Sequence, residues 1–170
     1  FQGGRRYLMQ QAIPVLRYHG RPFDVRALVQ NEPGRGWTVT GMAARIAGPR
    51  QITTHRPRGG SRAKLVPLLR RVLKSPERVE QAVKSLERAI VAAASAFDAA
   101  TGGTHGELSM DVALDRNGHP WILELNAKPM VFDEPAIRKH ARRRLIRYCF
   151  SAGGFPVPGG PKGTPAGRAL

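Results

Sequence analysis

Three oxygen-bearing side chains near the middle of the chain have the chemistry of a divalent metal site. Asp111 lies in one alternating run of residues, and Glu124 and Asn126 lie in the next. Carboxylate and amide oxygens are the ligands that Mg²⁺ takes at roughly 2.0–2.1 Å, with phosphate oxygens and waters completing its octahedron. The sequence therefore predicts a site for Mg²⁺, or alternatively Mn²⁺, if the local structure brings these side chains together.

The segment that carries them is typical of an antiparallel hairpin. Every second residue is apolar over residues 108–114, and Trp121, Leu123 and Leu125 repeat the pattern on one expected face. Asn117-Gly118 lies between the two runs, and this dipeptide favours a two-residue hairpin turn because both positions need positive φ. Arg116 would then face His119.

Counting outward from that turn places Asp111 opposite Glu124 and Ser109 opposite Asn126. Like charges placed directly opposite one another destabilise a sheet. A bound cation would make the arrangement tolerable. The alternative is an ordinary amphipathic hairpin whose polar face is solvated.

A second hairpin is predicted nearer the N-terminus. Residues 23–29 alternate, with Asp24 and Arg26 on one face, and a turn rich in Gly and Pro leads to a strand at residues 37–40. Residues 7–13 are predicted to form a further strand that ends at Pro14. On spacing alone, a surface ion pair between Asp24 and Arg26 is the preferred interpretation.

The segment between the hairpins contains a basic loop and two helices. Residues 45–60 start as a strand and continue as a loop with Arg, Gly, Thr and His, a composition suited to anion binding. Residues 64–74 predict a short or kinked helix because of Pro67. Ser75-Pro76-Glu77 predicts the start of a long helix that ends at residues 101–103. Its core stripe is expected to be Val79, Val83, Leu86, Ile90, Ala93 and Phe97.

A last helix is expected to begin at Pro135, with Ile137, Ala141, Leu145 and Tyr148 on one face and many arginines elsewhere. Cys149 is expected to be a small buried apolar residue, and a single cysteine fits a reducing, cytoplasmic compartment. No apolar run is long enough to span a bilayer.

The chain has 170 residues, 41% of them apolar, which suits one domain, and a net charge of +16. This charge predicts anionic partners, either nucleotide phosphates or, as a rival, nucleic acid bound by the Arg-rich first half and the last helix. We expect the nucleotide rather than nucleic acid.

Three segments together resemble one protein family. In chain order these segments are RPFDVRALVQ, VTGMAARI and GELSMDVALDRNGHPWILELNAKPM, and this order is the one expected of ATP-grasp proteins. Among ATP-grasp proteins, the segments are most similar to the YheC/YheD proteins associated with endospore coats. The resemblance covers about residues 7–150. It implies an α/β (α+β) fold, the C-terminal lobe of an ATP-grasp domain, with a mainly antiparallel sheet covered by helices.

The resemblance also implies roles for particular residues. It implies that Asp111, Glu124 and Asn126 hold Mg²⁺ and that Arg26 contacts the transferring phosphoryl group. It further implies a nucleotide site that includes Gln10, Gln11, Ile13, Arg58, Gly59 and Lys128, with His55 as a weaker candidate. The activity implied is ATP-dependent ligation, in which a carboxylate becomes an acyl-phosphate that an amine or thiol attacks. The carboxylate and amine or thiol substrates are not identified.

Residues 1–150 are expected to be the C-terminal part of an ATP-grasp domain whose N-terminal part is missing, and residues 151–170 a disordered Gly/Pro-rich tail. ATP-grasp proteins carry a phosphate-binding Lys and a Gly-rich loop ahead of this region, where the chain has only Gly3-Gly4 and Arg5-Arg6. A structural rival is a spore-coat component that keeps the fold without turnover and has other coat proteins as partners.

Overall fold

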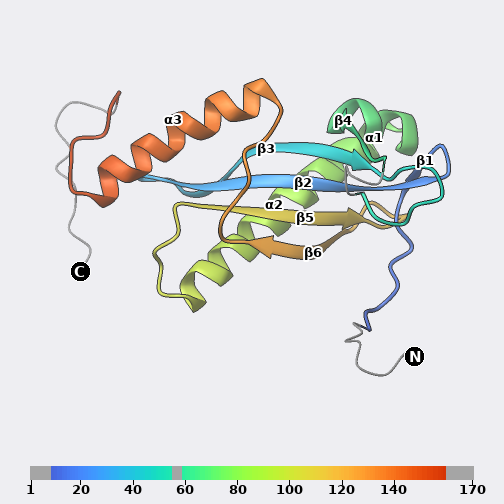
Figure 1. The fold of residues 1–170 in the computed structure, drawn as a ribbon, viewed down its shortest axis with the longest axis horizontal. Helices are drawn as coiled ribbons and strands as arrows, with labels where there is room; N and C mark the ends of the chain where they lie inside the picture. The colour runs from blue at the N-terminus through green and yellow to red at the C-terminus, as the bar shows by residue number, and fades with distance from the viewer. Residues whose placement is uncertain (1–8, 55–58, 160–170) are drawn as a thin grey trace.

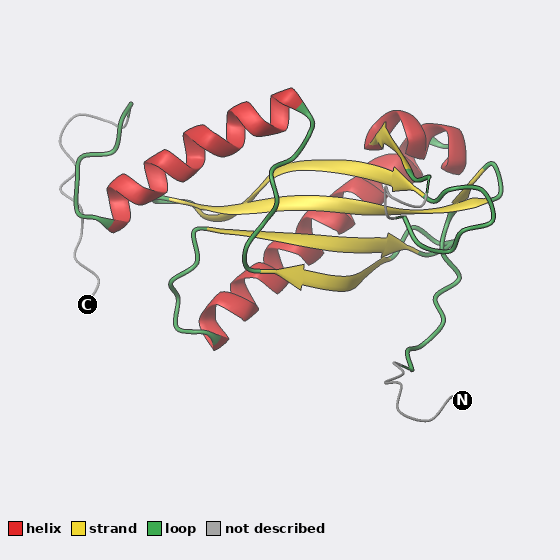
Figure 2. Cartoon of the chain, in the orientation of Figure 1, coloured by secondary structure: helices red, strands yellow, loops and turns green. Residues whose placement is uncertain are grey.

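The computed structural model describes residues 9–54 and 59–159, and within them three helices pack on a sheet of six strands (Figures 1 and 2). The strand order is β4-β3-β2-β5-β6, with β1 paired to β2, and every pairing is antiparallel. The elements in chain order are β1 (Arg17–Tyr18), β2 (Arg21–Glu32), β3 (Gly36–Ile46), β4 (Ser61–Lys64), α1 (Leu65–Leu73), α2 (Pro76–Ala100), β5 (Glu107–Leu114), β6 (Pro120–Asn126) and α3 (Pro135–Ala152).

The face of the sheet that α1 and α2 cover holds the main apolar core. Val25 and Ala27 of β2 pair with Val112 and Met110 of β5, and all four side chains are fully buried. Helix α2 runs diagonally behind the sheet in Figure 1. Its predicted stripe is confirmed: Val79, Leu86 and Ile90 are buried, and Val83, Ala93 and Phe97 are partly buried against the same cluster.

Both helices on this face begin where local chemistry favours it. Ser75 caps α2, with its Oγ accepting a hydrogen bond from the backbone N–H of Arg78 at 3.2 Å. Pro67 lies in the first turn of α1, where its missing N–H would have no intrahelical partner, so the helix is short but unbroken.

Helix α3 lies on the opposite face of the sheet and is fixed there by polar contacts. Gln30, which is fully buried, donates through Nε2 to Glu107 and to the backbone carbonyl of Ala141, both at 3.0 Å. Its Oε1 accepts from the hydroxyl of Thr40 at 2.7 Å. A Cβ added at Gly41 would lie only 2.6 Å from Ile137, so the glycine allows α3 to approach β3 closely.

Two sequence expectations differ from the structure. Residues 9–13 form no strand, and neither hydrogen bonds nor bridges pair them with a neighbouring strand in the described part of the chain. An extended segment becomes a strand only where another strand pairs with it, and composition does not report that partner. Cys149 on α3 is exposed rather than buried.

The expected domain boundary at residue 150 falls inside α3, which continues to Ala152. Residues 153–159 contain turns and irregular backbone but no helix or strand. The remainder of the expected disordered tail, residues 160–170, lies outside the described residues. A disordered tail from residue 151 therefore stays a prediction.

Candidate functional site

The polar side chains singled out in the sequence lie in one row across three strands. Arg26 on β2 is directly opposite Asp111 on β5, which in turn is opposite Glu124 on β6. Asn126 is opposite Ser109 in the neighbouring pair. Directly opposed residues point to the same face of a sheet, so the predicted facing of the two acids is confirmed.

The turn of this hairpin is one residue longer than expected. The backbone N–H of Asp115 donates to the carbonyl of His119 at 3.0 Å, which leaves Arg116, Asn117 and Gly118 as a three-residue loop. The carboxylate of Asp115 accepts from the N–H groups of Asn117 and His119 at 2.9 and 3.0 Å, and Gly118 has φ 81°. The side-chain hydrogen bonds of Asp115 therefore favour a turn that Asn-Gly alone did not predict.

A β-bulge in β6 compensates for the longer turn. Val112 is opposite Ile122, whereas Asp111 is opposite Glu124, so Leu123 is the extra residue. Without it, Glu124 would point to the α2 side of the sheet, since a shift of one residue exchanges the two faces. The bulge also places Trp121 and Leu125 on opposite faces of the sheet. Trp121 shares a face with Asp111, so the prediction of a single apolar face for β6 is wrong at Trp121.

A second bulge, in β3, acts in the same way on a residue that the sequence did not single out. Val29 is opposite Val39, but Leu28 is opposite Gly41, which makes Thr40 the extra residue. The shift places Arg45 opposite Asp24. Each of the two hairpins therefore uses a bulge to turn a charged side chain toward the polar face, and bulges are common beside functional sites.

Arg45 is the centre of a charge network on this face. Its Nε and Nη2 donate to the two carboxylate oxygens of Asp24 at 2.8 and 2.7 Å. The same Nη2 lies 2.7 Å from Oδ2 of Asp111. The hydroxyl of Thr54 adds a third hydrogen bond to Asp24 at 2.6 Å. The bidentate geometry fixes the orientation of Asp24, and the shared Nη2 ties Asp111 to the same guanidinium.

The surroundings of Arg45 keep it ionised. Burial lowers the pKa of its guanidinium, but hydrogen bonds and charge from Asp24, and then from Asp111, outweigh this effect and raise the pKa above its ordinary value. Because an arginine is already charged at any physiological pH, Arg45 is a permanent positive charge between the two carboxylates.

Arg26 makes weaker contacts and remains closer to solvent. Its Nη1 lies 3.3 Å from Oδ1 of Asp111, and its Nη2 is 3.4 Å from the hydroxyl of Ser109. The guanidinium carbon lies 5.7 Å from the ring centroid of Phe132. The surface pair of Asp24 with Arg26 that the sequence left open is not formed, since Asp24 pairs with Arg45.

These contacts change the electrostatic argument about the two acids. Asp111 is already neutralised by Arg26 and Arg45, so its position opposite Glu124 is tolerable without a cation. Glu124 is exposed and forms no hydrogen bond or ion pair with the residues that the structure describes. The donor set of two carboxylates and one nearby amide nevertheless suits Mg²⁺, because all are hard oxygen ligands and the Glu124 carboxylate is uncommitted.

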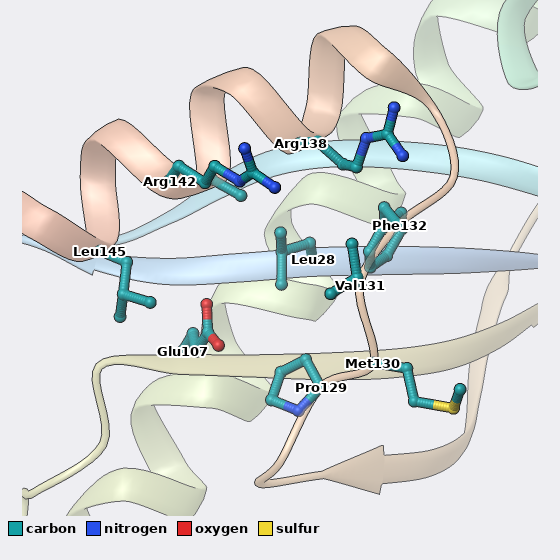
Figure 3. A pocket seen from close by; sticks show the side chains of 10 residues that line it. Leu28, Glu107, Pro129, Met130, Val131, Phe132, Arg138, Arg142 and Leu145 are labelled. Carbon is teal, nitrogen blue, oxygen red and sulfur yellow. The ribbon is translucent and has the colours of Figure 1, made fainter.

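A small cavity adjoins this site across the segment that links β6 to α3 (Figure 3). It has a volume of about 120 Å³ and lies between residues 129–132 and α3. Leu28 forms its floor and is two residues from Arg26 on the same face of β2. Phe132 lines the cavity and also packs on Arg26, so the charged site and the apolar cavity share one wall.

The other predicted site residues are not joined to this cluster. Gln10 and Gln11 are exposed and Ile13 is half-buried in the irregular segment before β1, while Lys128 is exposed after β6. No hydrogen bond or ion pair among the described residues connects their side chains to Asp111 or Glu124. Gly59 lies in the turn before β4 with φ 78°. His55 and Arg58 lie outside the described residues.

Sequence reasoning missed Arg45, Thr54 and Phe132. Arg45 is a charged residue within an otherwise small and apolar strand segment, Ala43-Ala44-Arg45-Ile46-Ala47, and this was a usable signal. Its pairing with Asp24 depends on the bulge at Thr40, which has no local signal. Phe132 lies in a connecting segment whose path across the sheet only the fold defines.

Known proteins with similar sequence or structure were found by comparison. The family model "YheC/D like ATP-grasp" matches residues 1–151. The endospore coat-associated protein YheD of Bacillus subtilis (strain 168) is 31% identical over 147 residues, which are 84% of this chain and 32% of that protein. The chain therefore spans about a third of the length of this curated relative.

A solved structure supports the fold independently. The C-terminal domain of K. lactis Pby1, described as an ATP-grasp enzyme interacting with the mRNA decapping enzyme Dcp2, matches with a TM-score of 0.57 and 14% identity. The match covers 94% of this chain and 52% of the Pby1 chain. At this identity the likeness concerns the fold alone. Together with the family match over residues 1–151, it means that the chain belongs to the YheC/D-like ATP-grasp family.

Proposed function

We propose that this chain contributes the metal- and phosphate-binding half of an ATP site. The observation that carries the proposal is the row of Arg26, Asp111 and Glu124 on one face of the sheet. A row that alternates a guanidinium with carboxylates offers cation and phosphate ligands side by side. Membership of an ATP-grasp family supports the same assignment.

Asp111, Glu124 and Asn126 would hold Mg²⁺, with Mn²⁺ as an alternative. When bound, the cation would neutralise charge on the phosphate oxygens of ATP. Arg45 keeps the Asp111 carboxylate oriented, and its ion pair with Asp24 holds Arg45 itself in place. Arg26, with a side chain 21% exposed, is the guanidinium that remains accessible to an incoming phosphoryl group.

The reaction that this arrangement supports is ATP-dependent ligation. A carboxylate substrate would be phosphorylated beside Arg26, and an amine or thiol would then attack the acyl-phosphate. The protein's contribution would be positioning and charge stabilisation, since phosphoryl transfer needs little covalent help from side chains. Membership of the family keeps Gln10, Gln11, Ile13, Arg58, Gly59 and Lys128 as candidates for further nucleotide contacts.

Calorimetric titration with ATP, with and without Mg²⁺, tests the proposal. Glu124→Gln is the informative variant, because this exposed side chain has no partner in the described structure and its loss leaves the fold intact. Loss of a charged ligand should weaken Mg²⁺-dependent ATP binding by about tenfold or more. Glu87→Gln, an exposed acid on α2 behind the sheet, is the matched control.

Equal Mg²⁺-dependent affinity in the Glu124→Gln variant and the wild type would contradict the metal assignment. Absence of ATP binding both by this chain and by a version with the preceding part of its ATP-grasp domain restored would contradict the nucleotide assignment and favour a non-catalytic role. We also propose that the protein is located at spore coats and has coat proteins as partners, because the name of the Bacillus relative suggests it. No helix among residues 9–54 and 59–159 combines the length and apolar character that crossing a membrane requires.

A further inference from the structure

A basic cavity lies between α3 and the end of β2, away from the candidate ATP site. It has a volume of about 150 Å³ and is lined by Glu32, His140, Arg143, Arg144 and Arg147. The four basic residues recur at i, i+3, i+4 and i+7 along α3, so they share one face of the helix. Glu32 and Arg26 are six residues apart on β2, which separates the two sites by about 20 Å.

One of these arginines has a structural task. Arg144 donates to the carbonyl of Val39 at 3.2 Å and to the hydroxyl of Thr40 at 3.1 Å. Its Nη2 lies 3.6 Å from Oε2 of Glu32. Arg144 thus attaches α3 to the sheet and neutralises the one carboxylate that lines the cavity.

The remaining basic groups have no such task. Among the residues that the structure describes, His140, Arg143 and Arg147 form no ion pair or hydrogen bond through their side chains. The Nε of Arg147 and the Oε2 of Glu32 are both buried, and neither has a hydrogen-bond partner among the described residues. A buried donor without a partner is rare in proteins and usually marks an absent water or ion. After Arg144 has offset Glu32, the cavity keeps the charge of Arg143 and Arg147.

We propose that this cavity is a second anion site, which binds a single phosphate group. Two arginines line this one small space, and arginine forms bidentate hydrogen bonds with phosphate. The volume is below the roughly 300–1,000 Å³ of pockets that enclose a whole organic ligand. The ligand is therefore inorganic phosphate or the phosphoryl group of a larger molecule whose remainder stays outside.

Titration with inorganic phosphate, followed by NMR of the arginine Nε–Hε groups, tests this assignment. Sodium chloride at equal ionic strength is the reference. We expect the Arg147 signal to shift saturably with phosphate and not with chloride, because its donor gains an acceptor. Arg147→Ala and Arg143→Ala should each weaken binding by about tenfold, as expected for a lost charge-assisted hydrogen bond.

Arg142→Ala is the matched control. Arg142 is one residue from Arg143 on the same exposed helix but lines the other cavity, near Glu107. Its loss should leave phosphate binding unchanged. Glycerol phosphate in place of inorganic phosphate separates the two sources of the group, and tighter binding of the ester identifies a phosphorylated molecule as the ligand.

Three results would overturn the second site. These are an equal shift with chloride, unchanged phosphate affinity in the Arg143→Ala/Arg147→Ala variant, and an arginine effect seen only with a single-stranded oligonucleotide. Shifts confined to Arg26 and Arg45 would also overturn it while supporting the proposed ATP site. The two proposals can therefore fail separately.

Discussion

Removing the Arg45 guanidinium should be the most damaging change to the polar face of the sheet. In Arg45→Met, a side chain that replaces only the aliphatic part of arginine would leave Asp24, which is 8% exposed, and Asp111 without their shared partner. Breaking a buried ion pair by removing one member costs about 3–5 kcal/mol. For a protein of this size each kcal/mol lowers Tm by about 2–4 °C, so we expect a fall of roughly 6–20 °C.

Urea unfolding followed by tryptophan fluorescence measures the free energy of unfolding without adding salt that would screen the ion pairs. Arg35→Met is the matched control. That side chain is 74% exposed and lies 4.0 Å from Glu32, so its loss should change the free energy of unfolding by no more than about 0.5 kcal/mol.

A double-mutant cycle with Asp24→Asn isolates the pair itself. The coupling between Asp24 and Arg45 should be about 1–3 kcal/mol, because the two side chains share two hydrogen bonds. If Arg45→Met is no more destabilising than Arg35→Met, the network is not a determinant of stability and Arg45 does not hold the Asp111 carboxylate in place.

Two further substitutions test the turn and the packing of α3. Burial raises the pKa of Asp115, but hydrogen bonds from Trp121 and from the backbone of His119 and Asn117 outweigh it and hold the pKa below its ordinary value of 3.8. A lowered folded-state pKa stabilises the protein above pH 3.8 and ceases to do so as pH falls through the folded value. Asp115→Asn should therefore cost about 1 kcal/mol in urea unfolding near neutral pH, with a difference that shrinks below pH 3.8; a constant difference would contradict the linkage. Gly41→Ala should cost about 1–3 kcal/mol, because its Cβ would lie 2.6 Å from Ile137, and adding Ile137→Ala should restore part of the loss. No recovery in that double variant would place the strain elsewhere.

The elements that the sequence predicted well are those with local signals. Ser75 and Pro76 start α2 through hydrogen bonding and backbone geometry that involve only neighbouring residues. The periodic apolar stripe of α2 and the alternation of β5 likewise report their own buried faces. The facing of Asp111 and Glu124 was predicted correctly, although through a turn of the wrong length.

The features that the sequence did not predict depend on contacts between residues that are distant in sequence. Residues 9–13 have the composition of a strand, but composition does not supply a pairing partner. Leu123 and Thr40 are each the extra residue of a bulge, and neither differs in type from its neighbours in a way that marks it. The charge network around Arg45 combines a bulge with a loop residue, Thr54, so it could not be derived from spacing.

The two bulges divide β3 and β6 into segments of opposite phase. On β6, the odd-numbered residue before Leu123, Trp121, faces the same side of the sheet as Asp111. The odd-numbered residue after it, Leu125, faces the opposite side. A one-residue deletion at Leu123 would exchange the sides of Glu124, Leu125 and Asn126 while leaving the hairpin tip unchanged. A relative that lacks one residue in either strand can therefore keep the same acids and still point them to the other face of the sheet. Strand length at these two positions is as much a determinant of the site as the identity of the acids themselves.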